Sequence, residues 1–230
     1  DSEATLTTDR FGNDNSAYSF DGVDDYIEVP HSSELTILGD ISFGGWIWLS
    51  SDITSDPSQA FISYGGGSES EINNVLYGAY IPHSTGNDIT YFHEQSSGSN
   101  VDYTFNVNLT TSKWYHVLFT RNVITKEIIF YLDGDKINNW TYSDNPSDGS
   151  TSKLYLGSGD FIGENDWGGK LDDFRIYNKI LTTEEIQEIY CENSWCEQHG
   201  LVAYYPFNGN ANDESGNNNH LDEYGEVELT

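Results

Sequence analysis

The segment 169–190 constrains the possible folds more than any other part of the chain. Residues 171–177 alternate between two faces, as side chains do along a β-strand. The chain then turns at Asn178, and Thr182 and Glu185 have the spacing of a capping box, which marks the start of a helix. The segment therefore predicts a strand that carries two adjacent acids and leads directly into a short helix.

This arrangement, with Asp172 and Asp173 as the acidic pair, resembles the closing strand of laminin-G-like domains of secreted bacterial proteins. Residues 200–220 resemble the first strand and loop of that family, and residues 11–30 resemble its second block. The resemblance implies an all-β fold. We expect a two-sheet antiparallel β-sandwich, the concanavalin A-like jelly roll, with one short C-terminal helix before a returning strand.

The three motifs occur in a cyclic order, and this order defines three segments. Residues 1–190 form the sandwich body, residues 191–199 form a cysteine-containing connection, and residues 200–230 are expected to complete the sandwich. We expect residues 201–207 to pair with residues 171–177 of the same chain, because an unpaired strand edge is costly. The alternative is that the same strand is donated to a neighbouring molecule.

Short apolar runs separated by Gly, Asn, Asp and Ser are typical of an all-β protein. Besides the closing strand, the runs predict strands at residues 17–20, 26–29, 41–49, 60–64, 75–81, 90–93, 103–107, 114–120, 128–132, 153–157 and 201–207. Asp133 and Gly134 predict a tight hairpin turn. Residues 65–98 depart from the family in length and composition, and we expect them to form long loops over one face.

The charge is strongly negative, with 9 Lys and Arg against 38 Asp and Glu and a net charge of −29. Such a surface repels phosphate groups, so we expect neither nucleic acid binding nor direct membrane insertion. The charge serves solubility in a salty medium, and we also expect bound cations to neutralise some of the carboxylates. No signal peptide is visible, which fits a segment of a secreted or cell-surface protein.

Catalytic motifs of this fold are not matched. Glucanases place two carboxylates on one strand in a Glu-x-Asp-x-x-Glu pattern. The nearest sequence begins at Glu164 and Asp166, and Gly169 stands where the second Glu is required. There is no Gly-x-Ser-x-Gly elbow either. We therefore do not expect an enzyme.

Calcium is the expected cofactor. The six histidines lack the spacing of zinc ligands, whereas oxygen donors are abundant. In concanavalin-like folds a calcium ion often joins the first and last strands to the loop after the second strand, and this resemblance implies Asp21, Gly22 and Asp172 as ligands. The alternative is that Asp21 and Gly22 only form a turn and that Asp173 only pairs with Arg175.

Aromatic side chains in the less family-like segments are candidates for sugar binding, because an aromatic face stacks on a sugar ring. These candidates are Tyr91, His93, Trp140 and Trp167. The alternative is that they anchor long loops. Trp46 is instead expected in the core.

Two cysteines, Cys191 and Cys196, follow the predicted helix. Without a second pair they make a poor metal site, and we expect a local disulfide in an exported protein. Two free thiols in a reducing compartment are the alternative.

Together these patterns predict a non-catalytic, calcium-stabilised recognition or adhesion module of a larger exported protein. Its expected ligand is a glycan or another cell-surface ligand, and its expected neighbours are other domains of the same polypeptide. One rival interpretation is a spacer repeat of a cell-surface protein. The other is a polysaccharide-degrading enzyme of the same fold.

Overall fold

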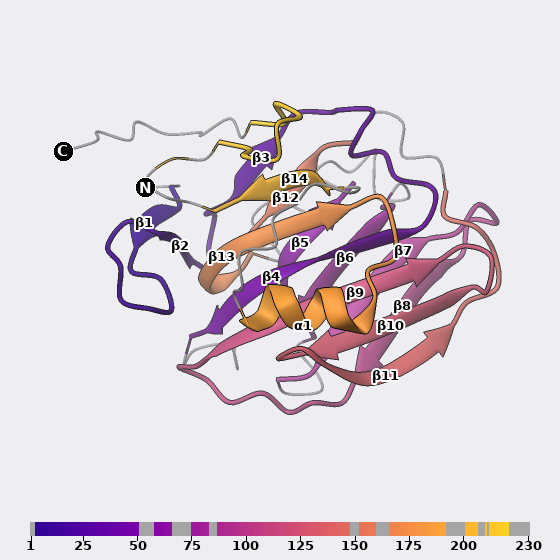
Figure 1. Ribbon diagram of the computed structural model, residues 1–230, viewed down its shortest axis with the longest axis horizontal. Coiled ribbons are helices and arrows are strands. Elements are labelled where there is room, and N and C mark those ends of the chain that lie inside the picture. The colour runs from indigo at the N-terminus through magenta and orange to yellow at the C-terminus, as the bar shows by residue number, and fades with distance from the viewer. Residues whose placement is uncertain are drawn as a thin grey trace.

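The computed structural model describes residues 3–50, 58–65, 75–82, 87–147, 152–159, 166–191, 201–206, 210 and 212–220. Two antiparallel sheets face each other and form a β-sandwich (Figure 1). The eight-stranded sheet has the order β1 (Thr5–Thr7), β2 (Ala17–Asp21), β13 (Gly168–Tyr177), β4 (Ile41–Leu49), β9 (Trp114–Asn122), β10 (Glu127–Leu132) and β11 (Asp135–Thr141), with β14 (Leu201–Tyr205) also paired to β13. The six-stranded sheet has the order β3 (Ile27–Val29), β12 (Leu154–Leu156), β5 (Gln59–Tyr64), β6 (Tyr77–Ile81), β7 (Ile89–Glu94) and β8 (Asn100–Phe105). This architecture confirms the fold expected from the sequence.

Aromatic side chains fill the space between the two sheets. Phe43 of β4 lies 5.2 Å from Tyr77 of β6, measured between ring centroids, and Phe119 of β9 lies 5.6 Å from Tyr91 of β7. All four side chains are fully buried. Such rings bury large apolar areas, so they contribute much of the energy that holds the sheets together.

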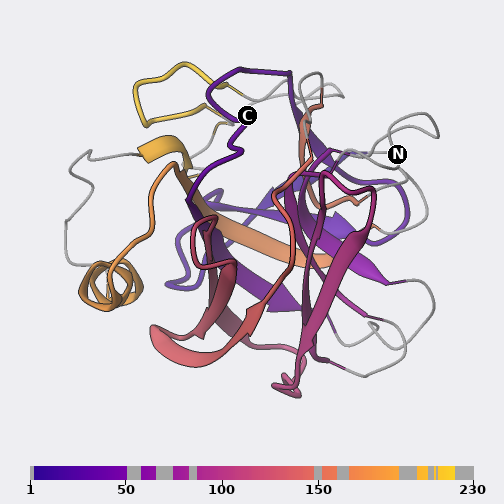
Figure 2. The ribbon, with the colours of Figure 1, turned by 90° about the vertical axis from the view of Figure 1, so that its right-hand side faces the viewer.

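The helix α1 (Thr183–Cys191) covers the outer face of the eight-stranded sheet, and Figure 2 shows it end-on beside the strands. Its start is the predicted capping box, because Thr182 N donates to Glu185 Oε2 (2.8 Å) and Glu185 N donates to Thr182 Oγ1 (3.2 Å). Ile186 is buried against the sheet in a second apolar cluster. No helix within the described ranges is long and apolar enough to cross a membrane.

The hairpin between β10 and β11 turns at the predicted residues. Asp133 and Gly134 both have positive φ angles, 50° and 80°, as a two-residue turn of this kind requires.

The expectation of long loops across residues 65–98 is wrong in part. β6 and β7 both lie within this segment, near the strands expected at residues 75–81 and 90–93, and pair with each other between β5 and β8. Nearly all of their side chains are buried, so both strands belong to the sandwich despite the lack of family likeness in this segment.

One edge of β13 is shared by two strands. β2 pairs with residues 168–171, and β14 pairs antiparallel with residues 174–177, while β4 runs along the opposite edge. The antiparallel pairing that we expected between residues 201–207 and the closing strand is therefore present within the one chain. Val202, Ala203 and Tyr205 of β14 are buried in the main core. β14 thus fills a part of the sandwich that would otherwise expose apolar surface.

Replacement of Tyr205 tests whether β14 belongs to the core. Tyr205→Ala removes a buried ring, and we expect the free energy of unfolding in urea to fall by about 3–5 kcal/mol. The control is Tyr204→Phe on the same strand, which loses one hydroxyl hydrogen bond to Asp173 and should cost about 1 kcal/mol. Equal, small losses for the two variants would show that β14 adds little to the core.

Candidate functional site

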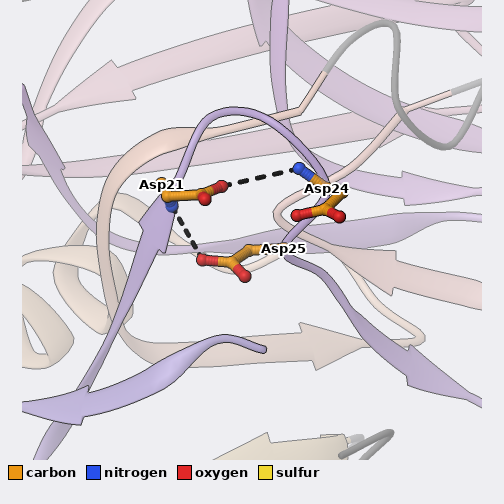
Figure 3. Close-up of side chains that lie close together, drawn as sticks. All are labelled: Asp21, Asp24 and Asp25. Atoms are coloured by element: carbon orange, nitrogen blue, oxygen red, sulfur yellow. Dashed lines mark hydrogen bonds between the residues drawn. The ribbon is translucent and has the colours of Figure 1, made fainter. Parts of the chain in front are cut away.

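Three carboxylates converge in the loop that joins the two sheets between β2 and β3. Asp21, at the end of β2, is followed closely by Asp24 and Asp25. One carboxylate oxygen from each of the three lies within 4.8 Å of those of the other two (Figure 3). Like charges at this distance repel each other, so the arrangement favours a bound cation.

Backbone hydrogen bonds hold this acidic loop in shape. Asp21 Oδ1 accepts from Val23 N (2.9 Å), and Asp25 Oδ2 accepts from Asp21 N (2.8 Å). Gly22 has φ of 79° and packs so closely on β13 that an added Cβ atom would lie 3.2 Å from the Gly168 Cα atom. A residue with a side chain would be strained there, which explains the glycine. The loop is therefore fixed against β13.

Asp25 is the member of the cluster that most needs a partner. It is 4 % exposed, and its Oδ1 atom makes no hydrogen bond. Burial raises the pKa of Asp25, the backbone N–H of Asp21 opposes this, and the charges of Asp21 and Asp24 raise it further. A cation at this point would supply the missing contact and offset the repulsion.

The acidic loop borders an open pocket of ≈ 540 Å³ next to the β1–β2 hairpin. The pocket is lined by Glu3, Thr5, Ser19, Phe20, Asp21 and Asp25. Most of these residues carry a carboxylate or a hydroxyl, and Phe20 is buried in the core behind them. Oxygen donors of this kind suit a hard divalent cation such as calcium.

The third predicted calcium ligand, Asp172, does not join this cluster. Asp21 pairs with Gly168 on β13, and Asp172 lies four residues farther along that strand, about 13 Å away. Its carboxylate is buried and forms an ion pair with Arg10. The structure thus brings together Asp21 and Gly22 from the predicted set and places Asp172 in a different network.

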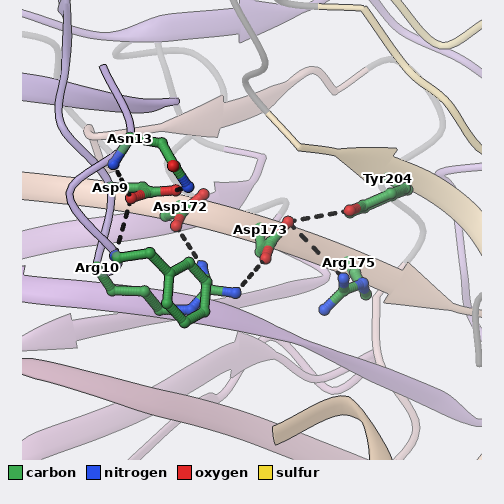
Figure 4. A network of polar contacts seen from close by, with 8 residues as sticks. Asp9, Arg10, Asn13, Asp172, Asp173, Arg175 and Tyr204 are labelled. Carbon is green, nitrogen blue, oxygen red and sulfur yellow. Dashed lines mark hydrogen bonds and ion pairs between the residues drawn. The ribbon is translucent and has the colours of Figure 1, made fainter. Parts of the chain in front are cut away.

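Arg10 is the centre of that network (Figure 4). Its guanidinium binds Asp172 through Nη1 and Asp173 through Nη2, the latter at 2.6 Å, and it lies 4.6 Å from the centroid of the Trp46 ring. Asp173 also accepts from Tyr204 Oη of β14 (3.0 Å). Arg10 therefore links the loop after β1 to β13 and, through Asp173, to β14.

The backbone of β13 bulges at this point. The pairing with β4 shifts by one residue between Asp172 and Arg175, and Asp173 has φ of 50°. An extra residue in one strand re-aims the neighbouring side chains, so both adjacent acids can face Arg10. The alternative that Asp173 pairs with Arg175 is also present, at 3.7 Å.

Burial raises the pKa of Asp172, and the negative charge of Asp173 adds to this, whereas Arg10 opposes it. The pKa of Asp172 is thereby raised to about 8, and the guanidinium of Arg10, which also packs on Trp46, limits this rise and holds the two acids together. Trp46 was expected in the core, and this expectation is wrong. Its ring is half-buried on the outer face of the sheet, where it stacks on Tyr190.

The structure corrects three of the four aromatic sugar-binding candidates. Tyr91 and Trp167 are 0 % exposed and His93 is 1 % exposed, because all three point between the sheets. They cannot stack on a ligand from solvent. Trp140 is half-buried and stacks on Tyr103 with 5.0 Å between ring centroids. Of the four, Trp140 alone retains an accessible ring.

The predicted disulfide stays a prediction. The Cys191 side chain and the whole of Cys196 lie outside the described residues. Glu164 of the incomplete glucanase pattern also lies outside them.

Two parts of the site were not predicted from the sequence. Asp24 and Asp25 belong to the same short acidic motif as Asp21. This acidic pair, close after Asp21 and Gly22, was the sequence feature that could have predicted their part in the cluster. Arg10 carried no signal, because its partners on β13 are 162 and 163 residues away.

The two stacked sheets, the returning strand and the acidic loop define a lectin-like jelly roll. The chain belongs to the concanavalin A-like lectin/glucanases superfamily, whose family model matches residues 21–187. The comparison with curated proteins gave no match.

Solved structures with this fold include proteins of several kinds. A candidate carbohydrate-binding protein from Bacteroides ovatus is 21 % identical to this chain, with a TM-score of 0.61. The matched region covers 82 % of this chain and 50 % of the Bacteroides chain. The CBM40 of Ruminococcus gnavus IT-sialidase, bound to α2,3-sialyllactose, is 13 % identical, with a TM-score of 0.61 and coverages of 76 % and 96 %. The receptor-binding domain of botulinum neurotoxin mosaic serotype C/D is 18 % identical, with a TM-score of 0.64 and coverages of 84 % and 45 %. The chain thus spans about half the length of the Bacteroides protein, and at these identities the likeness shows a shared fold.

The ion pairs of Arg10 can be tested by removing the guanidinium. In Arg10→Met the two acids lose their partner, and we expect the free energy of unfolding at pH 9 to fall by about 3–5 kcal/mol. The folded-state pKa of Asp172 is about 8 with Arg10 present, and without Arg10 it lies higher still. At pH 9 the folded variant therefore binds a proton that the wild type has largely released, and at pH 7 both folded proteins bind it. The loss of stability should consequently change between these two pH values, and it should be smaller at pH 7 than at pH 9.

Urea denaturation at both pH values measures this effect. The matched variant is the double substitution Arg10→Met with Asp172→Asn, in which the loss at pH 9 should be smaller and the pH dependence weaker. A loss for Arg10→Met that is the same at pH 7 and pH 9 would contradict this account.

Proposed function

We propose that this chain is a non-catalytic, calcium-stabilised module that binds carbohydrate for a larger exported protein. The observation that carries the proposal is the convergence of the carboxylates of Asp21, Asp24 and Asp25, because Asp21 and Asp25 also line one open pocket. Recognition modules of this kind use a rigid sandwich to position variable loops, and the ligand is held by the loops.

The donor set fits calcium. Calcium takes six to eight oxygen ligands, and flexible carboxylates and backbone carbonyls serve equally well. The residues that would hold the ion are Asp21, Asp24 and Asp25, and the buried Asp25 Oδ1 atom has no other partner. When bound, the ion supplies positive charge that neutralises the loop. The chain contributes the fixed geometry, because Gly22 packs against β13 at Gly168.

Carbohydrate is the favoured ligand class for two reasons. The fold is shared with a candidate carbohydrate-binding protein and with a CBM40 bound to α2,3-sialyllactose. The pocket also presents carboxylates and hydroxyls, which are groups that hydrogen-bond sugar hydroxyls. Trp140 of β11, at the other edge of the same sheet, offers an accessible aromatic ring for a sugar face.

A spacer repeat in a cell-surface protein is the second candidate function. It is favoured by the burial of Tyr91, His93 and Trp167, because this removes three aromatic contacts that a ligand could have used. A spacer would use calcium for stiffness alone. The two candidates agree on the metal and differ on the ligand, so separate experiments test them.

We expect calcium to raise the melting temperature of the protein. At a hundredfold excess over Kd, binding to the folded state stabilises by about 2.7 kcal/mol, which corresponds to about 5–10 °C for a chain of this size. Asp24→Asn should lose most of this rise, while its melting temperature in chelator should be unchanged or higher, since one repulsive charge is gone.

The matched control is Asp14→Asn, an exposed carboxylate outside the cluster, which should retain the full calcium effect. Calorimetric melting with chelator and with calcium gives the result. A wild-type protein that melts at the same temperature in both conditions contains no calcium site that contributes to stability.

A glycan array run with calcium and with chelator tests the ligand. We expect binding to one group of glycans in calcium and a large loss of signal in chelator or in Asp24→Asn. The spacer interpretation predicts no binding in either condition. Release of reducing ends or unsaturated products from any bound polysaccharide would instead reveal an enzyme.

A further inference from the structure

A positive charge lies between the two sheets without a carboxylate beside it. Arg121 of β9 is 0 % exposed, and its guanidinium donates to three backbone carbonyl oxygens: Leu76 through Nη1, and Ile37 (2.7 Å) and Gly39 (3.2 Å) through Nη2. Among the described residues no carboxylate forms an ion pair with it. Neutral carbonyls only partly offset the cost of burying a cation.

Polar atoms without partners surround this guanidinium. Arg121 Nε, Tyr91 Oη and both ring nitrogens of His93 are buried and make no hydrogen bond of full geometry to the protein. The Arg121 guanidinium and the Tyr91 hydroxyl nevertheless lie close enough to interact, since Arg121 opposes the rise in the pKa of Tyr91 that burial causes. Most buried polar groups in folded proteins are paired, and a group that is not paired to protein commonly binds a water or an ion. Three neighbouring side chains with such atoms therefore need a common explanation.

The three residues face the same part of the interior. Tyr91 and His93 lie two residues apart on β7 and point the same way, with 5.4 Å between their ring centroids. Val75 O accepts a hydrogen bond from Glu94 N (2.8 Å), so residue 75 lies beside the last residue of β7. The next residue, Leu76, therefore lies near His93. Because Arg121 binds the carbonyl of that residue, its head group lies beside this end of β7.

The chemistry of the three groups favours an acceptor with negative charge. Arginine Nε and the tyrosine hydroxyl donate. Burial, with the charges of Arg121 and Lys126, lowers the pKa of His93 to about 3, so its ring is neutral and offers one N–H donor. A buried set of donors around one fixed cation is matched by a small anion, and full burial leaves no room for a large one.

We propose that Arg121, Tyr91 and His93 bind one chloride ion between the sheets. The ion accepts from Arg121 Nε–H, from the Tyr91 hydroxyl and from one His93 N–H, and it neutralises the guanidinium. It thereby joins a strand of the eight-stranded sheet to a strand of the six-stranded sheet. This site is separate from the acidic loop, so it does not depend on the proposed function.

The experiment compares halide with gluconate at constant ionic strength and constant calcium. We expect the melting temperature of the full chain to rise in a saturable way as sodium chloride or sodium bromide replaces sodium gluconate. Tyr91→Phe removes one donor and should weaken the halide affinity about tenfold, as the loss of a hydrogen bond to a charged group does. Tyr77→Phe is the matched control, because the Tyr77 hydroxyl already donates to Leu35 O (3.0 Å). Its halide affinity should stay within about twofold of the wild type.

Crystals grown in sodium bromide give an independent readout. We expect one anomalous peak within hydrogen-bond distance of Arg121 Nε and Tyr91 Oη. A water at this point with no anomalous signal would overturn the proposal, as would equal melting temperatures in halide and gluconate. A halide effect that is the same in Tyr91→Phe as in Tyr77→Phe would also overturn it, because the ion would then bind elsewhere.

Discussion

The pairing along β13 is the constraint on which the rest of the structure depends. Two separate strands share one edge of β13, with β2 on residues 168–171 and β14 on residues 174–177. The bulge at Asp173 lies at the junction between them. Arg10 binds both acids of the bulge and so holds the junction closed. Without that contact, two buried negative charges would stand where the two strands meet.

This arrangement also fixes the acidic loop. β2 ends at Asp21 because its ladder with β13 ends at Gly168, and the loop turns back at Gly22 with β13 directly beneath it. The chain then crosses to the six-stranded sheet at β3. The carboxylates therefore lie at a point where the backbone is held from two sides. A site built in this way needs little rearrangement to accept an ion.

How much could be predicted from the sequence follows from the range of each interaction. Local patterns gave the closing strand, the capping box at Thr182 and the Asp133 hairpin, because each depends on residues a few positions apart. The assignment of Tyr91 and His93 to a ligand surface was wrong, because both side chains are buried. Their positions two residues apart on a strand put them on one face, and that face is the inner one. The acidic cluster could be predicted only in part, because the spacing of acids in the sequence does not reveal which carboxylate an arginine from another loop already binds.

The net charge of −29 has different consequences at the surface and in the interior. Dissolved salt screens exposed carboxylates from one another, and any salt does this equally well. Asp25 and Arg121 are buried, so bulk salt does not screen them, and each is left with an unpaired polar atom. A divalent cation at the first and a halide at the second would act as bound partners, each recognised by its size and its donor or acceptor set. If both are bound, the stability of this sandwich depends on the identity of the ions in its medium as well as on their concentration.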